Sequence, residues 1–347
     1  MTMPLSANLL HRTSARPGTL VSAAGSQVDA ARLAVYGALF AALVAAPLLI
    51  PGSFILTLAN AAAITAIAAL GLTVLTGTAG LLSLGQAGFL AVGAFTSAML
   101  VKYLGAGFFT CLLAGAAVAA VVGAIAAAAT VRAVGLYLAV GTLALQYTLE
   151  LLLTDVEVKL TSAVGFEMPA PKILGFEVVG QAGWWLLLSS AVLLCWLFLR
   201  WVVRSHVGRS WIVARDNPVV AQALGISILR SRTNAFALSA AIAGLAGALH
   251  GFYIGTVQIT NYTLHLSIVY LTVIVLGGPG RLFGAIWAAA LITLLPQVMS
   301  WLLRTLGVDV IARGAGAENM LLGLILILVL LKVPQSVSAL LQGRGAQ

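Results

Sequence analysis

Residues 107–130 read GFFTCLLAGAAVAAVVGAIAAAAT, a run that contains no charged side chain. A bilayer core about 30 Å thick is crossed by about 20 apolar helical residues, because lipid offers the backbone no hydrogen-bond partner. Similar runs recur along nearly the whole chain. Hydrophobic residues make up 61% of the 347 residues and charged residues only 8%, too few to cover a water-soluble surface. The sequence therefore indicates an all-α, polytopic membrane protein.

Windows of this kind predict a transmembrane helical bundle of about ten spans over residues 31–333. The second and third spans are the least regular, and a broken or re-entrant helix is an alternative for each. The predicted spans are 31–50, 54–75, 86–104, 107–130, 134–153, 183–203, 233–257, 264–280, 282–303 and 317–333.

The distribution of basic residues predicts the orientation of this bundle. If the N-terminus is cytoplasmic, most of the 18 Lys and Arg residues fall on the cytoplasmic side, as the positive-inside rule requires. Residues 1–30 and 334–347 are then cytoplasmic tails, with a cytoplasmic loop at 204–232 and an external loop at 154–182. A cleaved signal peptide is the less favoured alternative, because the polar segment before the first span is long. The net charge of +9 does not indicate nucleic-acid binding, because the basic residues are scattered through loops.

The segment 204–232, RSHVGRSWIVARDNPVVAQALGISILRSR, is a basic island between apolar spans. Asp216 or Asn217 can cap a short helix that starts at Pro218 and runs to Leu224, and Gly225 can end it in a left-handed conformation. Two interpretations stay open: a docking site for a soluble partner, or a surface helix that rests on anionic headgroups. Within this island, Val219, Val220, Ala223 and Leu224 are expected to supply apolar contacts, while Arg209, Arg215 and Gln222 stay polar.

Glycine forms two patterns. Gly247, Gly251 and Gly255 recur every four residues in span 233–257, and Gly244 extends the stripe. Small residues at this spacing let a second helix approach closely, so these glycines are predicted to pack helices together.

The second pattern interrupts an apolar run. Gly77, Gly80 and Gly85 alternate with polar residues between spans 54–75 and 86–104, and a weaker interruption lies at 277–284. Backbone freed from a helix at membrane depth must face protein or water, so such interruptions indicate a transport path. A tight cytoplasmic turn over 77–85 is the alternative.

Few ionisable side chains lie inside the spans. Glu150, His250 and His265 are each close enough to a span end for ordinary placement at the membrane interface. No set of buried carboxylates or histidines suggests a proton relay, a metal site or a catalytic centre, and the chain has no phosphate-binding loop. The chain is therefore not expected to be an enzyme, and any ATP used in transport must bind to another polypeptide.

Four ordered stretches resemble one family of permeases. Residues 208–226, GRSWIVARDNPVVAQALGI, resemble the cytoplasmic loop of branched-chain amino acid ABC permeases of the LivM type. Three more regions resemble that family's signatures in the same order, and the resemblance covers roughly residues 35–333. These regions are 71–96, 135–144 and the pair 239–249 and 275–285.

The resemblance implies a membrane subunit of an ATP-driven importer in the bacterial inner membrane, which moves branched-chain amino acids by alternating access. It implies a second, related permease, a solute-binding protein outside the membrane, and two cytoplasmic ATPases that bind ATP and magnesium. Same-superfamily permeases for urea, amides, aromatic acids or sugars are the alternative, and an ion-driven secondary transporter is a more distant one. Residues 160–166 depart from the family pattern in the external loop, which leaves the solute open.

The resemblance also implies roles for particular residues. The helix that couples to an ATPase would comprise Asp216, Asn217, Pro218, Val219, Val220, Ala221, Gln222, Ala223, Leu224 and Gly225. The translocation path would lie near Thr76, Gly77, Gly80, Ser83, Gly85, Gln86, Thr142 and Gln146.

Overall fold

The computed structural model describes residues 53–305, except 131–135, 163–164, 174–175 and 179. The predicted spans 31–50 and 317–333 and both predicted tails lie outside the described residues.

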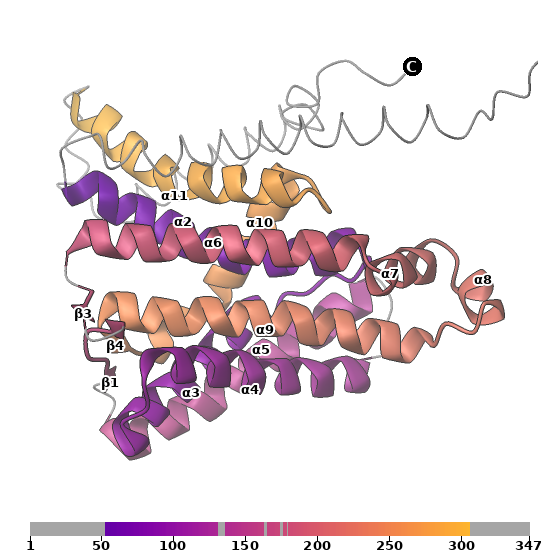
Figure 1. Cartoon of the computed structure of the whole chain (residues 1–347), viewed down its shortest axis with the longest axis horizontal. Helices are drawn as coiled ribbons and strands as arrows, with labels where there is room; N and C mark the ends of the chain where they lie inside the picture. The colour runs from indigo at the N-terminus through magenta and orange to yellow at the C-terminus, as the bar shows by residue number, and fades with distance from the viewer. Residues whose placement is uncertain (1–52, 131–135, 163–164, 174–175, 179, 306–347) are drawn as a thin grey trace, which may run out of the picture. The chain divides into compact units, whose positions relative to one another are not determined.

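The described chain is a bundle of long apolar helices that run roughly side by side (Figure 1). Among the described residues, seven helical segments are long and apolar enough to cross a membrane, and η1 (Ile259–Tyr262) together with α10 (Leu264–Gly277) forms one of them. Helix α11 (Leu282–Thr305) has a shorter apolar part, Leu282–Gln297, and is not one of the seven. Each predicted span between residues 54 and 303 coincides with a helix, so the membrane class is confirmed. The helices are α2 (Ser53–Gly77), α3 (Gln86–Leu104), α4 (Phe108–Thr130), α5 (Leu136–Thr161), α6 (Gln181–Arg204), α9 (Ile228–Ile254), α10 (Leu264–Gly277) and α11 (Leu282–Thr305).

Helix α9 packs against α2, α3 and α4. Small residues determine how closely the helix backbones approach one another. A Cβ atom added to Gly93 of α3 would lie 2.1 Å from the carbonyl oxygen of Gly244. One added to Gly247 would lie 1.9 Å from the carbonyl oxygen of Leu90. Only glycine fits at these contacts, because any side chain would have to displace backbone.

The glycine stripe of α9 does not act as a unit. A Cβ added to Gly251 would lie 4.0 Å from Cβ of Ala94 in α3, and its nearest neighbour, at 2.6 Å, would be the side chain of Val257. Gly255 has a φ of +80° and ends α9, with its N–H donating to the carbonyl of Gly251 at 3.0 Å. The prediction that Gly255 packs helices together was therefore wrong, because this glycine is a left-handed C-cap despite its regular spacing.

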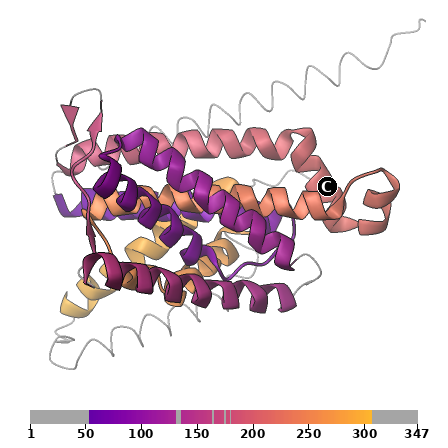
Figure 2. The same cartoon turned by 90° about the horizontal axis from the view of Figure 1, so that it is seen from below.

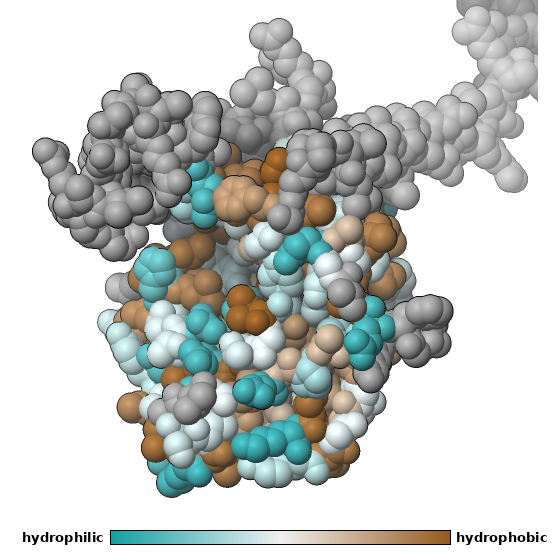
Figure 3. Space-filling model, turned by 90° about the vertical axis from the view of Figure 1, so that its left-hand side faces the viewer, coloured by the Kyte–Doolittle hydropathy of each residue, from teal (hydrophilic) through white to brown (hydrophobic). Residues whose placement is uncertain are grey.

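One end of the bundle carries short strands that an all-α prediction leaves out. β1 (Phe166–Glu167) pairs antiparallel with β4 (Thr256–Val257), and β2 (Lys172–Ile173) pairs with β3 (Phe176–Glu177). Helix α5 continues to Thr161, so the predicted loop 154–182 begins with helix. Hydrophilic residues are interspersed with apolar ones over this strand end (Figure 3).

The opposite end carries α7 (His206–Asp216) and α8 (Pro218–Ala223), between α6 and α9 (Figures 1 and 2). Trp211 fixes α7 to the bundle, since its side chain is only 2% exposed. Helix α8 projects beyond the ends of the long helices (Figure 1). We call this the arginine-rich end, after Arg204, Arg209, Arg215 and Arg230.

Candidate functional site

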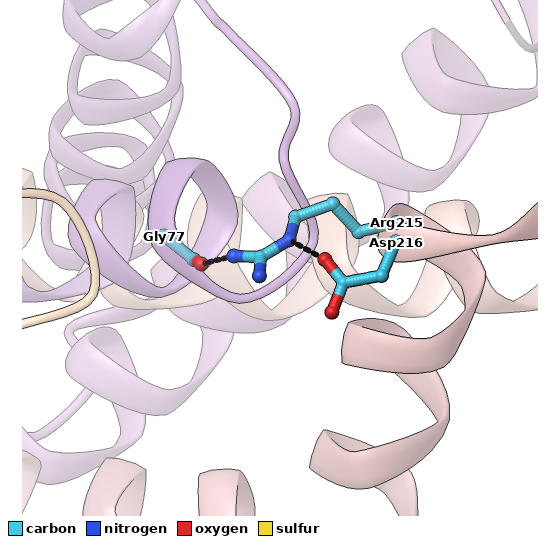
Figure 4. Close-up of polar contacts among 3 residues, drawn as sticks. All are labelled: Gly77, Arg215 and Asp216. Carbon is cyan, nitrogen blue, oxygen red and sulfur yellow. Dashed lines mark hydrogen bonds and ion pairs between the residues drawn. The ribbon is translucent and has the colours of Figure 1, made fainter.

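Most of the residues predicted for docking and for the path lie in two regions: the projecting helix α8 and a buried polar region between α3, α5 and α10. In α8, Asn217 is the N-cap, because its Oδ1 accepts the N–H of Val220 at 3.1 Å. Asp216 does not cap; its Oδ1 accepts from Nε of Arg215 at 2.8 Å (Figure 4). The helix ends at Ala223, and Gly225 follows with a φ of +78°. The local sequence thus folds as a capped helix of less than two turns.

The apolar side chains of α8 point away from the bundle. Val219 is 76% exposed and Leu224 is 68% exposed, whereas Ala221 is fully buried. The expected apolar contacts of these residues with a partner stay a prediction. We call the exposed residues Val219, Val220, Ala223 and Leu224 the docking face.

The buried region forms where two segments between the long α-helices enter the bundle, the second of which includes the 3-10 helix η1. Residues 78–85 come from the arginine-rich end and lead into α3, and residues 255–263 come from the strand end and lead into α10. The first turn of a helix leaves N–H groups without intrahelical partners. Side chains supply those partners here: Oγ of Ser267 accepts from the N–H of Ala87 at 2.9 Å, and Oε1 of Gln146 accepts from the N–H of Gly88.

Gln146 joins the two segments. Its Oε1 binds the start of α3, while its Nε2 donates to the carbonyl of Tyr262 at 3.0 Å. One turn earlier on α5, Oγ1 of Thr142 accepts the N–H of Leu84 at 2.9 Å. Gln146 lies about 15 Å along α5 from Leu136, at about 1.5 Å per residue, within the length of this candidate membrane span. We call Ser83, Gln86, Thr142, Gln146, Tyr262 and Ser267 the buried junction, and all are 0% exposed.

The structure separates the predicted path residues into two groups. Ser83, Gln86, Thr142 and Gln146 belong to the buried junction, with Gly85 beside Thr142. Gln86 donates to the carbonyl of Ala68 at 3.0 Å, and its Oε1 has no hydrogen-bond partner among the described residues. Thr76, Gly77 and Gly80 lie instead at the arginine-rich end, where α2 stops.

The two glycine-rich interruptions meet at that end. A Cβ added to Gly77 would lie 1.9 Å from the backbone nitrogen of Gly280, in the turn between α10 and α11. Neither interruption breaks a helix in its middle: residues 78–85 and 278–281 are connections between helices. The alternative of a turn at 77–85 holds for Gly77 and Gly80, whereas Ser83 and Gly85 already lie inside the bundle.

The ionisable residues differ in their surroundings. Nδ1 of His250 lies 3.0 Å from the hydroxyl of Tyr262, so this partly buried side chain contacts the polar interior one turn before α9 ends, and its placement at the membrane interface stays a prediction. His265 is exposed, and Glu150 is partly buried with no partner for its Oε2 in the described chain. Within residues 53–305, apart from the gaps given above, no three His, Cys, Asp or Glu side chains gather where a metal ion could bind.

Sequence reasoning missed three residues that hold these regions together. Ser267 and Tyr262 are isolated polar residues beside or within an apolar span, a signal that could have singled them out. Arg215 gave no such signal, because an arginine in a basic loop is ordinary. Its Nη1 donates to the carbonyl of Gly77, far away in the sequence (Figure 4).

Comparison with known proteins places the chain among transport permeases. Residues 54–330 match the family described as branched-chain amino acid transport system / permease component. The high-affinity branched-chain amino acid transport system permease protein LivM of Salmonella typhimurium is 32% identical over 255 residues, which cover 66% of this chain and 60% of LivM. LivM of Escherichia coli K12 matches to the same extent.

A shorter similarity extends to a second kind of importer. The autoinducer 2 import system permease protein LsrC of Salmonella paratyphi B is 30% identical over 138 residues, 38% of each chain. No solved structure matches. The chain spans 60% of the length of the LivM proteins that it matches. Because the family match covers nearly all the described helices and agrees with the four sequence signatures, the chain belongs to the permease family of branched-chain amino acid transport systems.

Proposed function

We propose that this chain is the membrane-spanning permease subunit of an ATP-driven ABC importer, and that branched-chain amino acids are its solutes. The observation that carries the proposal is the docking face. Its apolar side chains are exposed on a capped helix that projects from the bundle, in a chain of the permease family. Exposed apolar side chains surrounded by polar ones are typical of a protein interface.

In this proposal, two cytoplasmic ATPases bind ATP and Mg²⁺, and one of them receives α8 in a groove. Their closure moves α8 and shifts the bundle between inward-open and outward-open states in the bacterial inner membrane. A second, related permease completes the path, and a solute-binding protein delivers solute at the strand end. The clustering of arginines at the end that carries α8 supports a cytoplasmic position for that end.

The buried junction is the proposed centre of the path. A zwitterionic amino acid needs polar contacts at both its ends, and the junction concentrates hydroxyl, amide and backbone groups in the interior of the bundle. Its residues are covered in the isolated chain, so solute would reach them only when the helices move or the second permease is present.

The docking proposal is tested with two Val→Arg variants. Val219→Arg places a charge on the docking face, and Val207→Arg places the same charge at a 45% exposed valine of α7 outside that face. The complex is purified through a tag on this chain, and the ATPases that are recovered are quantified. Val219→Arg is expected to reduce their recovery at least about tenfold, because burying an unpaired charge at an interface centre costs several kcal/mol. Equal recovery from both variants would remove the docking face from the interface.

The solute is tested by transport into vesicles that contain the whole complex. We expect ATP-dependent uptake of leucine, isoleucine or valine, and no uptake when the ATPases are left out. The similarity to LsrC keeps a different solute as the second candidate, so urea, short amides, aromatic acids and sugars belong in the same competition assay. Uptake that persists without the ATPases and collapses with the ion gradient would indicate a secondary transporter.

A further inference from the structure

Arg215 connects the docking segment to the place where α2 ends. Its Nη1 donates to the carbonyl of Gly77, and its Nε donates to Oδ1 of Asp216 at 2.8 Å (Figure 4). The planar guanidinium is thereby held by two partners on different sides. Asp216 directly precedes Asn217, the cap of α8, so the contact reaches the docking helix through one peptide bond.

The aliphatic part of Arg215 lies against the same turn. Gly80 has a φ of +68°, and a Cβ there would lie 2.4 Å from Cγ and 2.7 Å from Cδ of Arg215. Glycine is required at this position both for the backbone conformation and for the space that the arginine occupies. The side chain therefore contacts the turn at Gly77 and again at Gly80.

The turn leads directly into the buried junction. Four residues after Gly80, the N–H of Leu84 donates to Oγ1 of Thr142 at 2.9 Å. A Cβ on Gly85 would lie 3.0 Å from the carbonyl oxygen of Thr142, so the segment is closely packed against α5. At the other end, the buried Trp211 keeps α7 attached to the bundle. A continuous series of contacts thus runs from α8 through Arg215 and the turn to α5.

From these contacts we infer that Arg215 is a positioning residue, which transmits displacement of α8 to residues 78–85 and so to the buried junction. The inference rests on the proposed function, because it needs an ATPase that moves α8. It separates two properties: the docking face binds the ATPase, and Arg215 carries the movement inward. Loss of Arg215 leaves the docking face intact, so ATP hydrolysis continues while transport fails.

The test measures solute uptake and ATP hydrolysis in vesicles that contain the complete importer, with Arg215→Ala, Arg215→Lys and Arg209→Ala. Arg209 is the matched control, since it lies on the same helix and its guanidinium contacts His206 and not the turn. We expect the ATPases to co-purify with every variant. Arg215→Ala should lower the ratio of uptake to hydrolysis about tenfold, the loss that corresponds to one hydrogen bond with a charged group. Arg209→Ala should leave the ratio unchanged, and Arg215→Lys should restore part of it.

Gly80→Ala tests the same contact by changing the turn and not the arginine. Its added methyl group displaces the arginine stem, so the ratio should fall again, and the double variant with Arg215→Ala should be no worse than the more severe single variant. An unchanged ratio in Arg215→Ala, or an equal fall in Arg209→Ala, would overturn the inference. Failure of the ATPases to co-purify with the unaltered chain would instead contradict the proposed function.

Discussion

The docking face and the buried junction reverse the arrangement that a water-soluble protein would have. At the docking face, valine and leucine side chains are exposed on a projecting helix, and at the buried junction, glutamine, serine and threonine side chains are fully covered. The difference follows from the backbone. Residues 78–85 and 255–258 leave helical geometry, and buried backbone groups freed in this way need polar partners. Helix α5 supplies two of them: Thr142 accepts the N–H of Leu84, and Glu157 accepts the N–H of Ile259. Helix α8 satisfies its own first turn through Asn217, so its apolar residues remain available for another protein.

The largest effect is expected from Gln146→Leu, which tests the polar side of this comparison. The variant leaves the N–H of Gly88 and the carbonyl of Tyr262 buried without their partner, at a cost of about 1–3 kcal/mol for each group. The apparent melting temperature of the purified protein in detergent should fall clearly. Gln222→Leu on the exposed surface of α8 is the control and should leave it unchanged. Equal melting temperatures would mean that the amide of Gln146 does not hold the two segments.

An intermediate effect is expected from Asn217→Ala, which tests the docking side. Loss of an N-cap costs a helix about 1 kcal/mol, and α8 is too short to absorb that loss. Binding of the ATPases should weaken about fivefold, as measured by titration of the purified subunits. The melting temperature of the bundle should stay the same, because α8 packs on it through little more than Ala221.

Asn217→Asp keeps an oxygen acceptor at the cap and should restore binding. If Asn217→Ala lowers the melting temperature as much as Gln146→Leu, the two regions are not independent, and the comparison fails.

The smallest effect is expected from Lys159→Ala. This variant tests whether the burial of a polar contact determines how much its loss lowers the melting temperature. Lys159 pairs with Asp155 at 2.6 Å on the outer part of α5, but the two side chains are 70% and 59% exposed. Such a pair contributes at most about 0.5 kcal/mol, so the melting temperature should hardly change.

Glu157 on the same helix is the contrast. It is 5% exposed, and its carboxylate accepts the N–H of Ile259 at 2.8 Å. Glu157→Ala should therefore lower the melting temperature more than Lys159→Ala does. The reverse order would show that exposure is a poor guide to the strength of these contacts.

The sequence predicted much of the helical framework and less of the site. Apolar windows located the helices between residues 54 and 303, because the length of a membrane helix follows from the thickness of the bilayer. Pro218, Gly225 and the two candidate caps located α8 to within one residue at its end. The strands, the outer extension of α5 and the C-cap role of Gly255 were not predicted, because each depends on residues distant in the sequence or on a backbone angle that spacing does not reveal.

The sequence alone was enough to indicate a multi-pass membrane protein with a short capped helix in a basic loop, because composition, run length and local caps act over a few neighbouring residues. The permease family was indicated by the resemblance of four ordered stretches. The contacts between distant residues are visible only in the folded chain: Gln146 meets Gly88 and Tyr262, and Arg215 meets Gly77. A hydrogen bond between distant residues depends on how the helices pack, and that packing is set by the whole bundle together.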